Sequence, residues 1–67
     1  MNYEELKRFI AERGLKQRYI ARGMGVSDKR MHDLINGGHW KLTEVIAFCS
    51  FLKLTRTQRE RIFFATV

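Results

Sequence analysis

Apolar residues recur every three or four positions along nearly the whole chain, and this spacing limits the fold more than any other feature of the sequence. Such a repeat places apolar side chains along one side of an α-helix, whereas strands need an alternating pattern, which the sequence lacks. Proline, which ends or kinks helices, is absent. The sequence therefore predicts an all-α fold. Because the chain has 67 residues, we expect one domain, 1–67, with a small core.

Five short helices are expected, most of them bounded by glycine or by a residue that caps a helix start. They cover about residues 3–13, 16–24, 28–36, 42–52 and 56–64. Asn2 and Glu5 have the spacing of a capping box, in which two residues satisfy free backbone N–H groups at the first turn of a helix. The same spacing recurs at Thr55 and Gln58. Gly14 is placed to end the first helix in a left-handed conformation.

The second and third helices meet at Gly25-Val26-Ser27, where glycine supplies a positive φ, valine an apolar anchor and serine a strong N-cap. Just before this turn, Gly23 weakens the second helix by about 1 kcal/mol relative to alanine, unless it helps to end that helix. The third helix directs Met31, Leu34 and Ile35 inward. Its outer face is entirely polar: Asp28, Lys29, Arg30, His32 and Asp33. Two helices joined in this way form a helix-turn-helix, whose second helix can enter the major groove of DNA.

The charge of the chain favours the same partner. Thirteen lysines and arginines outnumber seven acidic residues, which gives a net charge of +6. Residues 13–41 hold seven of the basic residues and only two of the acidic ones. Basic domains favour polyanions, because nucleic-acid affinity depends on neutralised phosphates and released counterions. The alternative is that these side chains only solubilise helix surfaces.

The pattern of small, apolar and polar residues resembles that of the phage repressor and Cro class of helix-turn-helix proteins. The match is most specific at Gln17, Ala21 and Gly25-Val26-Ser27, and it extends over about residues 6–64. The resemblance implies a lambda-repressor-like DNA-binding domain with its helix-turn-helix at about 16–36. It also implies double-stranded DNA as the partner.

By this resemblance, the helix 27–36 enters the major groove. Its base-reading face would consist of Ser27, Asp28, Lys29, Arg30, His32 and Asp33. Lysine or arginine suits guanine, and an aspartate such as Asp33 can accept a hydrogen bond from cytosine. The phosphate contacts would come from Gln17, Arg18, Asn36, Gly38, His39 and Lys41. The last four of these lie in the loop after the helix, where the resemblance implies that backbone amides and side chains hold phosphates.

The fourth helix is apolar on nearly every side, so it is either central to the core or covered by a partner. Proteins of this class usually bind palindromic operators as twofold dimers, and we expect a homodimer. The possible dimer interface is formed by Phe48, Phe51, Phe63, Phe64 and Val67. The alternative is that the core absorbs all of these residues. Trp40 is expected to cover the core, and Trp40-Lys41 stands where the family usually has a Pro-Ser pair.

Other chemistry finds little support. His32, His39 and Cys49 lack the spacing of metal ligands, and Cys49 on an apolar helix is expected to be a small core residue. Because we find no catalytic constellation and no phosphate-binding glycine loop, we expect no enzyme activity, no metal and no cofactor. The single cysteine, the acidic first residues and the lack of a long apolar run predict a protein of the bacterial cytoplasm, without membrane association and bound to the nucleoid through DNA.

The function expected is that of a sequence-specific transcriptional regulator, a Cro-like repressor that blocks an operator. Two alternatives stay open. In the first, the chain is a protein-binding module that pairs with a repressor, which the acidic residues of the recognition face and the apolar fourth helix allow. In the second, it is the DNA-binding antitoxin of a toxin pair.

Overall fold

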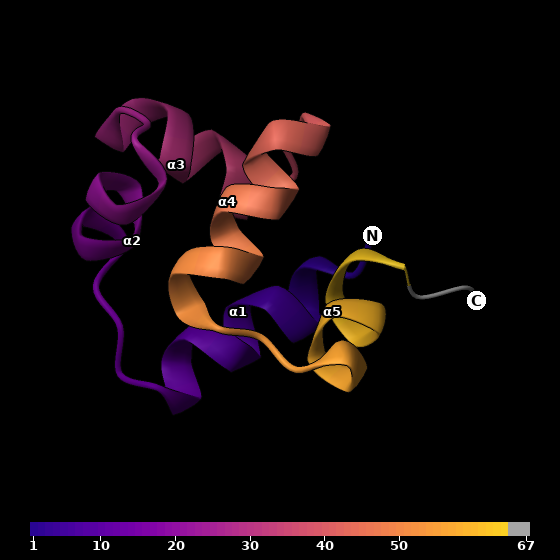
Figure 1. Ribbon diagram of the computed structural model, residues 1–67. Helices are drawn as coiled ribbons and strands as arrows, with labels where there is room; N and C mark the ends of the chain where they lie inside the picture. Colours follow the sequence, from indigo (N-terminus) through magenta and orange to yellow (C-terminus); the bar gives the residue numbers. More distant parts are fainter. Residues whose placement is uncertain (65–67) are drawn as a thin grey trace.

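The computed structural model describes residues 1–64, which form five α-helices joined by short turns (Figure 1). The helices are α1 (Tyr3–Glu12), α2 (Gln17–Met24), α3 (Asp28–Ile35), α4 (Leu42–Leu52) and α5 (Arg56–Phe63). Every boundary lies within one residue of the expected one, and residues 1–64 contain no strand, so the predicted all-α fold is confirmed. No helix in this range has the length and apolar character that crossing a membrane requires.

Most of the predicted helix ends form as expected. Gly14 and Gly25 have φ angles of +63° and +76°, the left-handed conformation in which glycine carries little penalty. Thr55 and Gln58 form the complete capping box, with bonds of 2.9 and 3.2 Å. The box expected at Asn2 is only half formed. Its side chain accepts the Glu5 N–H, but its own N–H donates to the Ile62 carbonyl at 2.7 Å and joins the start of α1 to α5.

The core lies around α4, which crosses the centre of the molecule between the α2–α3 pair and α1 with α5 (Figure 1). Its largest member is Phe48, which is completely buried. Three aromatic rings surround it, with ring centroids 6.1 Å away for Phe9, 5.5 Å for Trp40 and 5.7 Å for Phe63. Tilted and edge-to-face pairs at such distances add to the stability that burial gives. This cluster joins α4 to α1, to the loop after α3 and to α5.

Gly23 allows α2 and α4 to approach each other closely. A Cβ at this position would overlap the ring of Phe51 in α4. The ring also packs against Tyr19 of α2, with centroids 5.1 Å apart. Gly23 therefore does more than weaken α2, because it provides the space for an aromatic side chain that fixes the angle between two helices.

Candidate nucleic-acid interface

The turn between α2 and α3 is held by backbone hydrogen bonds. The Gly25 N–H donates to the Arg22 carbonyl at 3.2 Å, and the Val26 N–H donates to the Ala21 carbonyl at 3.0 Å. The Ser27 hydroxyl then caps α3 by accepting the Arg30 N–H at 3.0 Å. Because the local sequence satisfies the free groups at both helix ends, the direction of α3 relative to α2 is fixed by the turn itself.

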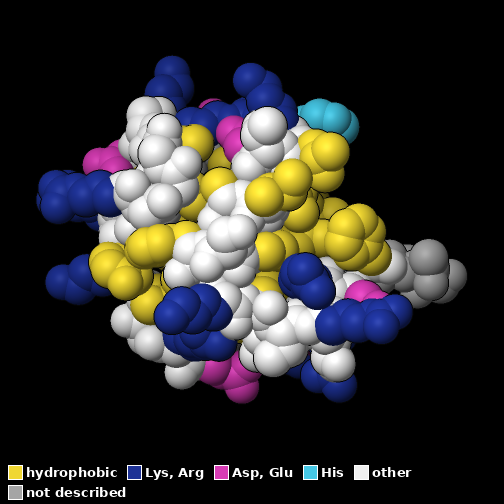
Figure 2. Space-filling model, in the orientation of Figure 1, with side chains coloured by type: hydrophobic (Ala, Val, Ile, Leu, Met, Phe, Trp, Pro, Cys, Tyr) yellow, Lys and Arg dark blue, Asp and Glu magenta, His cyan; other side chains and the backbone are white. Residues whose placement is uncertain are grey.

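The outward side of α3 is polar, as expected. Asp28, Lys29, His32 and Asp33 are exposed, whereas Met31, Leu34 and Ile35 are buried. Figure 2 shows lysine and arginine side chains projecting from the edge that α2 and α3 form. The structure thus brings together most of the residues expected to read bases on one exposed helix face.

Arg30 departs from this arrangement. We expected it to face outward with the base-reading residues, but its guanidinium forms a two-pronged ion pair with the carboxylate of Glu44 in α4. Nε and Nη2 each donate at 2.7 Å, and Nη2 also donates to the His39 carbonyl at 2.8 Å. Glu44 is only 8% exposed, whereas the Arg30 side chain is 33% exposed, so the pair lies at the edge between α3 and α4 with the carboxylate on its inner side. The expectation failed because the partner is 14 residues away along the chain and only packing brings it near.

The ion pair also shifts the titration of both groups. The hydrogen bonds from Arg30 lower the pKa of Glu44 below its ordinary value, with a further contribution from the Lys41 N–H. The same hydrogen bonds raise the pKa of Arg30. Both groups therefore stay charged near neutral pH, and the pair persists there.

Two further residues of the expected site lie at the junction of α2 and α3. Arg18 is exposed, and its Nε is 3.6 Å from a carboxylate oxygen of Asp28. The Gln17 side chain points toward the start of α3, with its Nε2 3.5 Å from the Asp28 carbonyl, a long contact at the limit of a hydrogen bond. Gln17 therefore spans from α2 to α3, while Arg18 stays at the surface.

The loop after α3 only partly matches the expected phosphate site. Gly38 donates its N–H to the Asp33 carbonyl at 2.6 Å, and its own carbonyl accepts from the Tyr3 hydroxyl at 2.6 Å. A Cβ at Gly38 would clash with the Asp33 carbonyl, so this glycine serves a close backbone approach. Its N–H is already used within the protein, which corrects the expectation that it binds phosphate.

The other members of this loop keep exposed side chains. His39 and Lys41 are exposed, and Asn36 is exposed although its side-chain amide donates to the His32 carbonyl at 2.8 Å. Trp40 covers the core as expected, and its indole N–H donates to the Leu34 carbonyl at 2.9 Å. The loop therefore presents two basic or titratable side chains beside α3 on a backbone held by the core.

Sequence reasoning missed two residues that shape this site. Glu44 had a signal, because an acid at the third position of a helix often accepts the N–H of the capping residue, and here it accepts the Lys41 N–H at 2.8 Å. Tyr3 had none, since its contact with Gly38 joins residues 35 positions apart. Both residues hold the loop in place, and neither is expected to contact DNA.

The residues expected at a dimer interface differ in how far they are buried. Phe48 is completely buried and cannot meet a second copy of the folded chain. Phe51 is half-buried against α2, and Phe63 is half-buried between Trp40 and the core. Phe64 is 63% exposed, and Val67 lies outside the described residues. Phe48 was therefore assigned wrongly, because one small core does enclose it.

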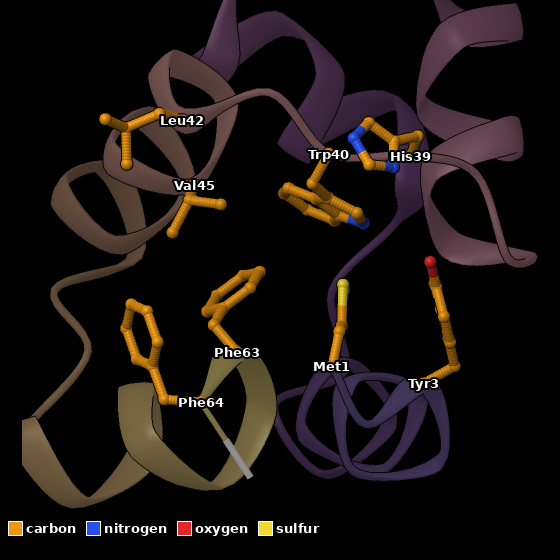
Figure 3. A pocket seen from close by; sticks show the side chains of 8 residues that line it. All are labelled: Met1, Tyr3, His39, Trp40, Leu42, Val45, Phe63 and Phe64. Atoms are coloured by element: carbon orange, nitrogen blue, oxygen red, sulfur yellow. The ribbon is translucent and has the colours of Figure 1, made fainter. Parts of the chain in front are cut away.

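The apolar residues that do reach the surface are different ones. Leu42 is 71% exposed and Ile46 is 56% exposed, one helical turn apart on α4. With the half-buried Val45 and with Phe64 they form what we call the apolar face, visible as hydrophobic side chains over α4 in Figure 2. Beside it a cavity of about 350 Å³ opens between α4, the end of α5 and the start of the chain (Figure 3). Its walls are Met1, Tyr3, His39, Trp40, Leu42, Val45, Phe63 and Phe64.

Metal and thiol chemistry find no support in this arrangement. Within residues 1–64, no three His, Cys, Asp or Glu side chains are grouped so that they could hold a metal ion. Burial raises the pKa of the Cys49 thiol, which therefore stays protonated at neutral pH. A protonated thiol is a weak nucleophile.

Two short helices joined at a left-handed glycine, with the second helix capped by serine and polar on its outer face, define a helix-turn-helix DNA-binding domain. The model of the Cro/C1-type HTH DNA-binding domain family matches residues 5–57, and the chain belongs to this family. The expected resemblance is confirmed, and DNA is the partner that the domain implies. Comparison with curated proteins and with solved structures gave no match.

Proposed function

We propose that this protein is a sequence-specific transcriptional repressor that inserts α3 into the major groove of an operator. The observation that carries the proposal is the exposed polar face of α3 on a helix whose opposite side is fully buried. A helix held in this way presents its side chains to base edges with little freedom, which specific readout requires.

The residues of this face take different roles in the proposal. Lys29 lies in the first turn of α3, where a cation opposes the helix dipole unless an anion is near, so its position favours contact with DNA. His32 and Asp33 lie one turn further along, where they can donate to or accept from bases. Ser27 and Asp28 stand at the start of the helix, where residues of a helix in the major groove can also reach base edges.

Phosphate contacts would surround this face. The proposed residues are Gln17, Arg18, Asn36, His39 and Lys41, which come from α2 and from the loop after α3. Contacts of this kind orient the protein on the duplex without reading sequence. They are also the part of the interface that salt weakens most.

We further propose that two copies bind one palindromic operator as a homodimer, joined at the apolar face. An exposed leucine and isoleucine on one helix, together with Phe64, form a contiguous apolar surface of the kind that marks association sites. The dimer would double the DNA surface covered and space the two α3 helices about one helical turn of DNA apart. Occupancy of the operator would then follow protein concentration in the bacterial cytoplasm and exclude polymerase.

The proposal is tested by selecting duplexes from a random library and titrating the enriched sequence at two salt concentrations. We expect an enriched palindrome whose affinity falls strongly with Lys29→Glu. Lys7→Glu is the matched control, since Lys7 is exposed on α1 and lies outside the helix-turn-helix, and it should change affinity little. Enrichment of no sequence, with only weak binding that disappears as salt rises, would refute the proposed regulator.

A second candidate function is a protein-binding module that modulates a repressor. One observation favours it: Arg18 of α2 is paired with Asp28 and Arg30 of α3 with Glu44, which lowers the positive potential at the recognition face. A module of this kind would keep its partner after Lys29→Glu, whereas the repressor would lose its DNA. A DNA-binding antitoxin is distinguished from both by copurification with a small toxin.

A further inference from the structure

The Arg30–Glu44 pair joins three segments at one point. Arg30 belongs to α3, Glu44 to α4, and the His39 and Lys41 backbones to the loop between them. The Glu44 oxygens accept three hydrogen bonds, two from Arg30 at 2.7 Å and one from the Lys41 N–H at 2.8 Å. A carboxylate on a residue that is 8% exposed, with three accepted hydrogen bonds, restricts the arrangement of its donors.

The pair also decides which side chains of α3 can reach DNA. Arg30 lies between Lys29 and Met31, and its guanidinium is turned away from the exposed face toward α4. Nε and Nη2, which form one edge of its fork, are occupied by Glu44, and Nη2 also donates to the His39 carbonyl. Arginine usually reads guanine through two parallel donors, and with both Nη2 hydrogens engaged Arg30 cannot supply them without giving up its bond to Glu44 or to the His39 carbonyl.

We propose that Glu44 is a positioning residue for DNA recognition: it holds Arg30 away from the bases and fixes the loop 36–41 against α3. The inference rests on the proposed function and deepens it, because it assigns specificity to a residue that does not touch DNA. Arg30 is then a support of the recognition helix and not one of its readers. The bases are read by its exposed neighbours.

A charge-neutral double variant tests the proposal. Arg30→Gln with Glu44→Gln removes the ion pair and leaves the net charge unchanged. On a random duplex, we expect the dependence of affinity on salt to match the wild type, whereas Lys29→Gln lowers the slope by about 0.9. A double variant whose slope falls by the same amount would show that Arg30 contacts phosphate, and it would overturn the proposal.

Specificity separates positioning from a merely structural role. We expect the ratio of affinities for the selected and the random duplex to fall about tenfold or more in the double variant, at a temperature well below its melting temperature. Equal loss on both duplexes, or no loss on either, would contradict a positioning role. The matched control is Arg56→Gln with Glu60→Gln, an exposed ion pair on α5, which should leave slope and ratio unchanged.

The wild-type protein supplies a test that does not depend on the stability of the variant. The Arg30 Nε–H, which donates to Glu44, should give a resolved NMR signal in the free protein that keeps its shift when a DNA duplex is added. Movement of this signal on binding would show that Arg30 leaves Glu44 for DNA and would refute the inference. If the wild type prefers no DNA sequence, the proposed function fails. The Nε–H signal of the free protein still shows in that case whether Glu44 holds Arg30.

Discussion

The α2–α3 surface and the apolar face of α4 differ in the kind of side chain that they expose and in what orients those side chains. On the α2–α3 side most exposed groups are charged or polar, and hydrogen bonds or ion pairs orient several of them, as with Ser27 and Arg18. On α4, Leu42 and Ile46 are exposed and make no directional contact that could orient them. A polar surface can be specified by the protein alone, whereas an exposed apolar surface gains its stability only when something covers it. The two surfaces nevertheless rest on the same central helix, so changes in that helix should affect both.

The largest effect is expected when the shared support is removed. Phe48→Ala leaves a cavity beneath three other aromatic rings and should lower the free energy of unfolding by about 3–5 kcal/mol. DNA binding and self-association should then fail together, because neither surface stays in place. Urea denaturation followed by DNA titration checks this. Loss of only one activity in a folded variant would show that the two surfaces have separate supports.

The next effect concerns the packing of α2 on α4. Alanine in place of glycine usually stabilises a helix by about 1 kcal/mol, but Gly23→Ala should destabilise this protein by about 1–3 kcal/mol, since the added methyl meets the Phe51 ring. Denaturant unfolding measures the sign directly. In a Phe51→Leu background the same substitution should cost much less, and an unchanged cost there would contradict the role given to the ring.

A smaller effect should separate the two surfaces. Lys29→Gln should reduce affinity for the selected duplex about tenfold, or ~1.4 kcal/mol, because it removes one cation from the recognition face. Analytical ultracentrifugation should find its self-association unchanged. If the substitution altered self-association as well, the two surfaces would not be independent.

The smallest effect on stability should come from the apolar face. Leu42→Gln with Ile46→Gln should change the free energy of unfolding by less than about 0.5 kcal/mol per substitution, since both side chains are exposed and glutamine suits a helix. Self-association should nevertheless be lost, as measured by sedimentation. Thr43→Gln, also exposed on α4, serves as the control and should leave association intact. If the double variant associates like the wild type, the apolar face is not the dimer interface.

The sequence predicts well what depends on neighbouring residues. The helix ends at Gly14, Gly25 and Ser27 follow from local backbone chemistry, and the buried stripe of α3 follows from its spacing. Together they place the helix-turn-helix within one residue. Every part of the site that local chemistry controls was therefore accessible before the structure.

Most of the errors have a different cause, which is contact between distant residues. Arg30 was expected among the readers because nothing near it in the sequence shows that Glu44 comes within 2.7 Å. Gly38 is a different case, because its N–H donates to the Asp33 carbonyl only five residues back, as is common where a helix ends at a left-handed glycine, and only its contact with Tyr3 is distant. The number of apolar side chains alone could not show that Phe48 lies inside and Leu42 outside.

The hydrogen bond between the Asn2 N–H and the Ile62 carbonyl brings the two ends of the helical region within 2.7 Å of each other. A chain whose ends lie side by side can be rejoined in a different order without changing its packing. Joining the ends with a few glycines and opening the chain at Gly14, in the exposed turn before α2, should give a circular permutant with the same core. In that permutant the helix-turn-helix would come first, and α1 would follow α5 across the new linker.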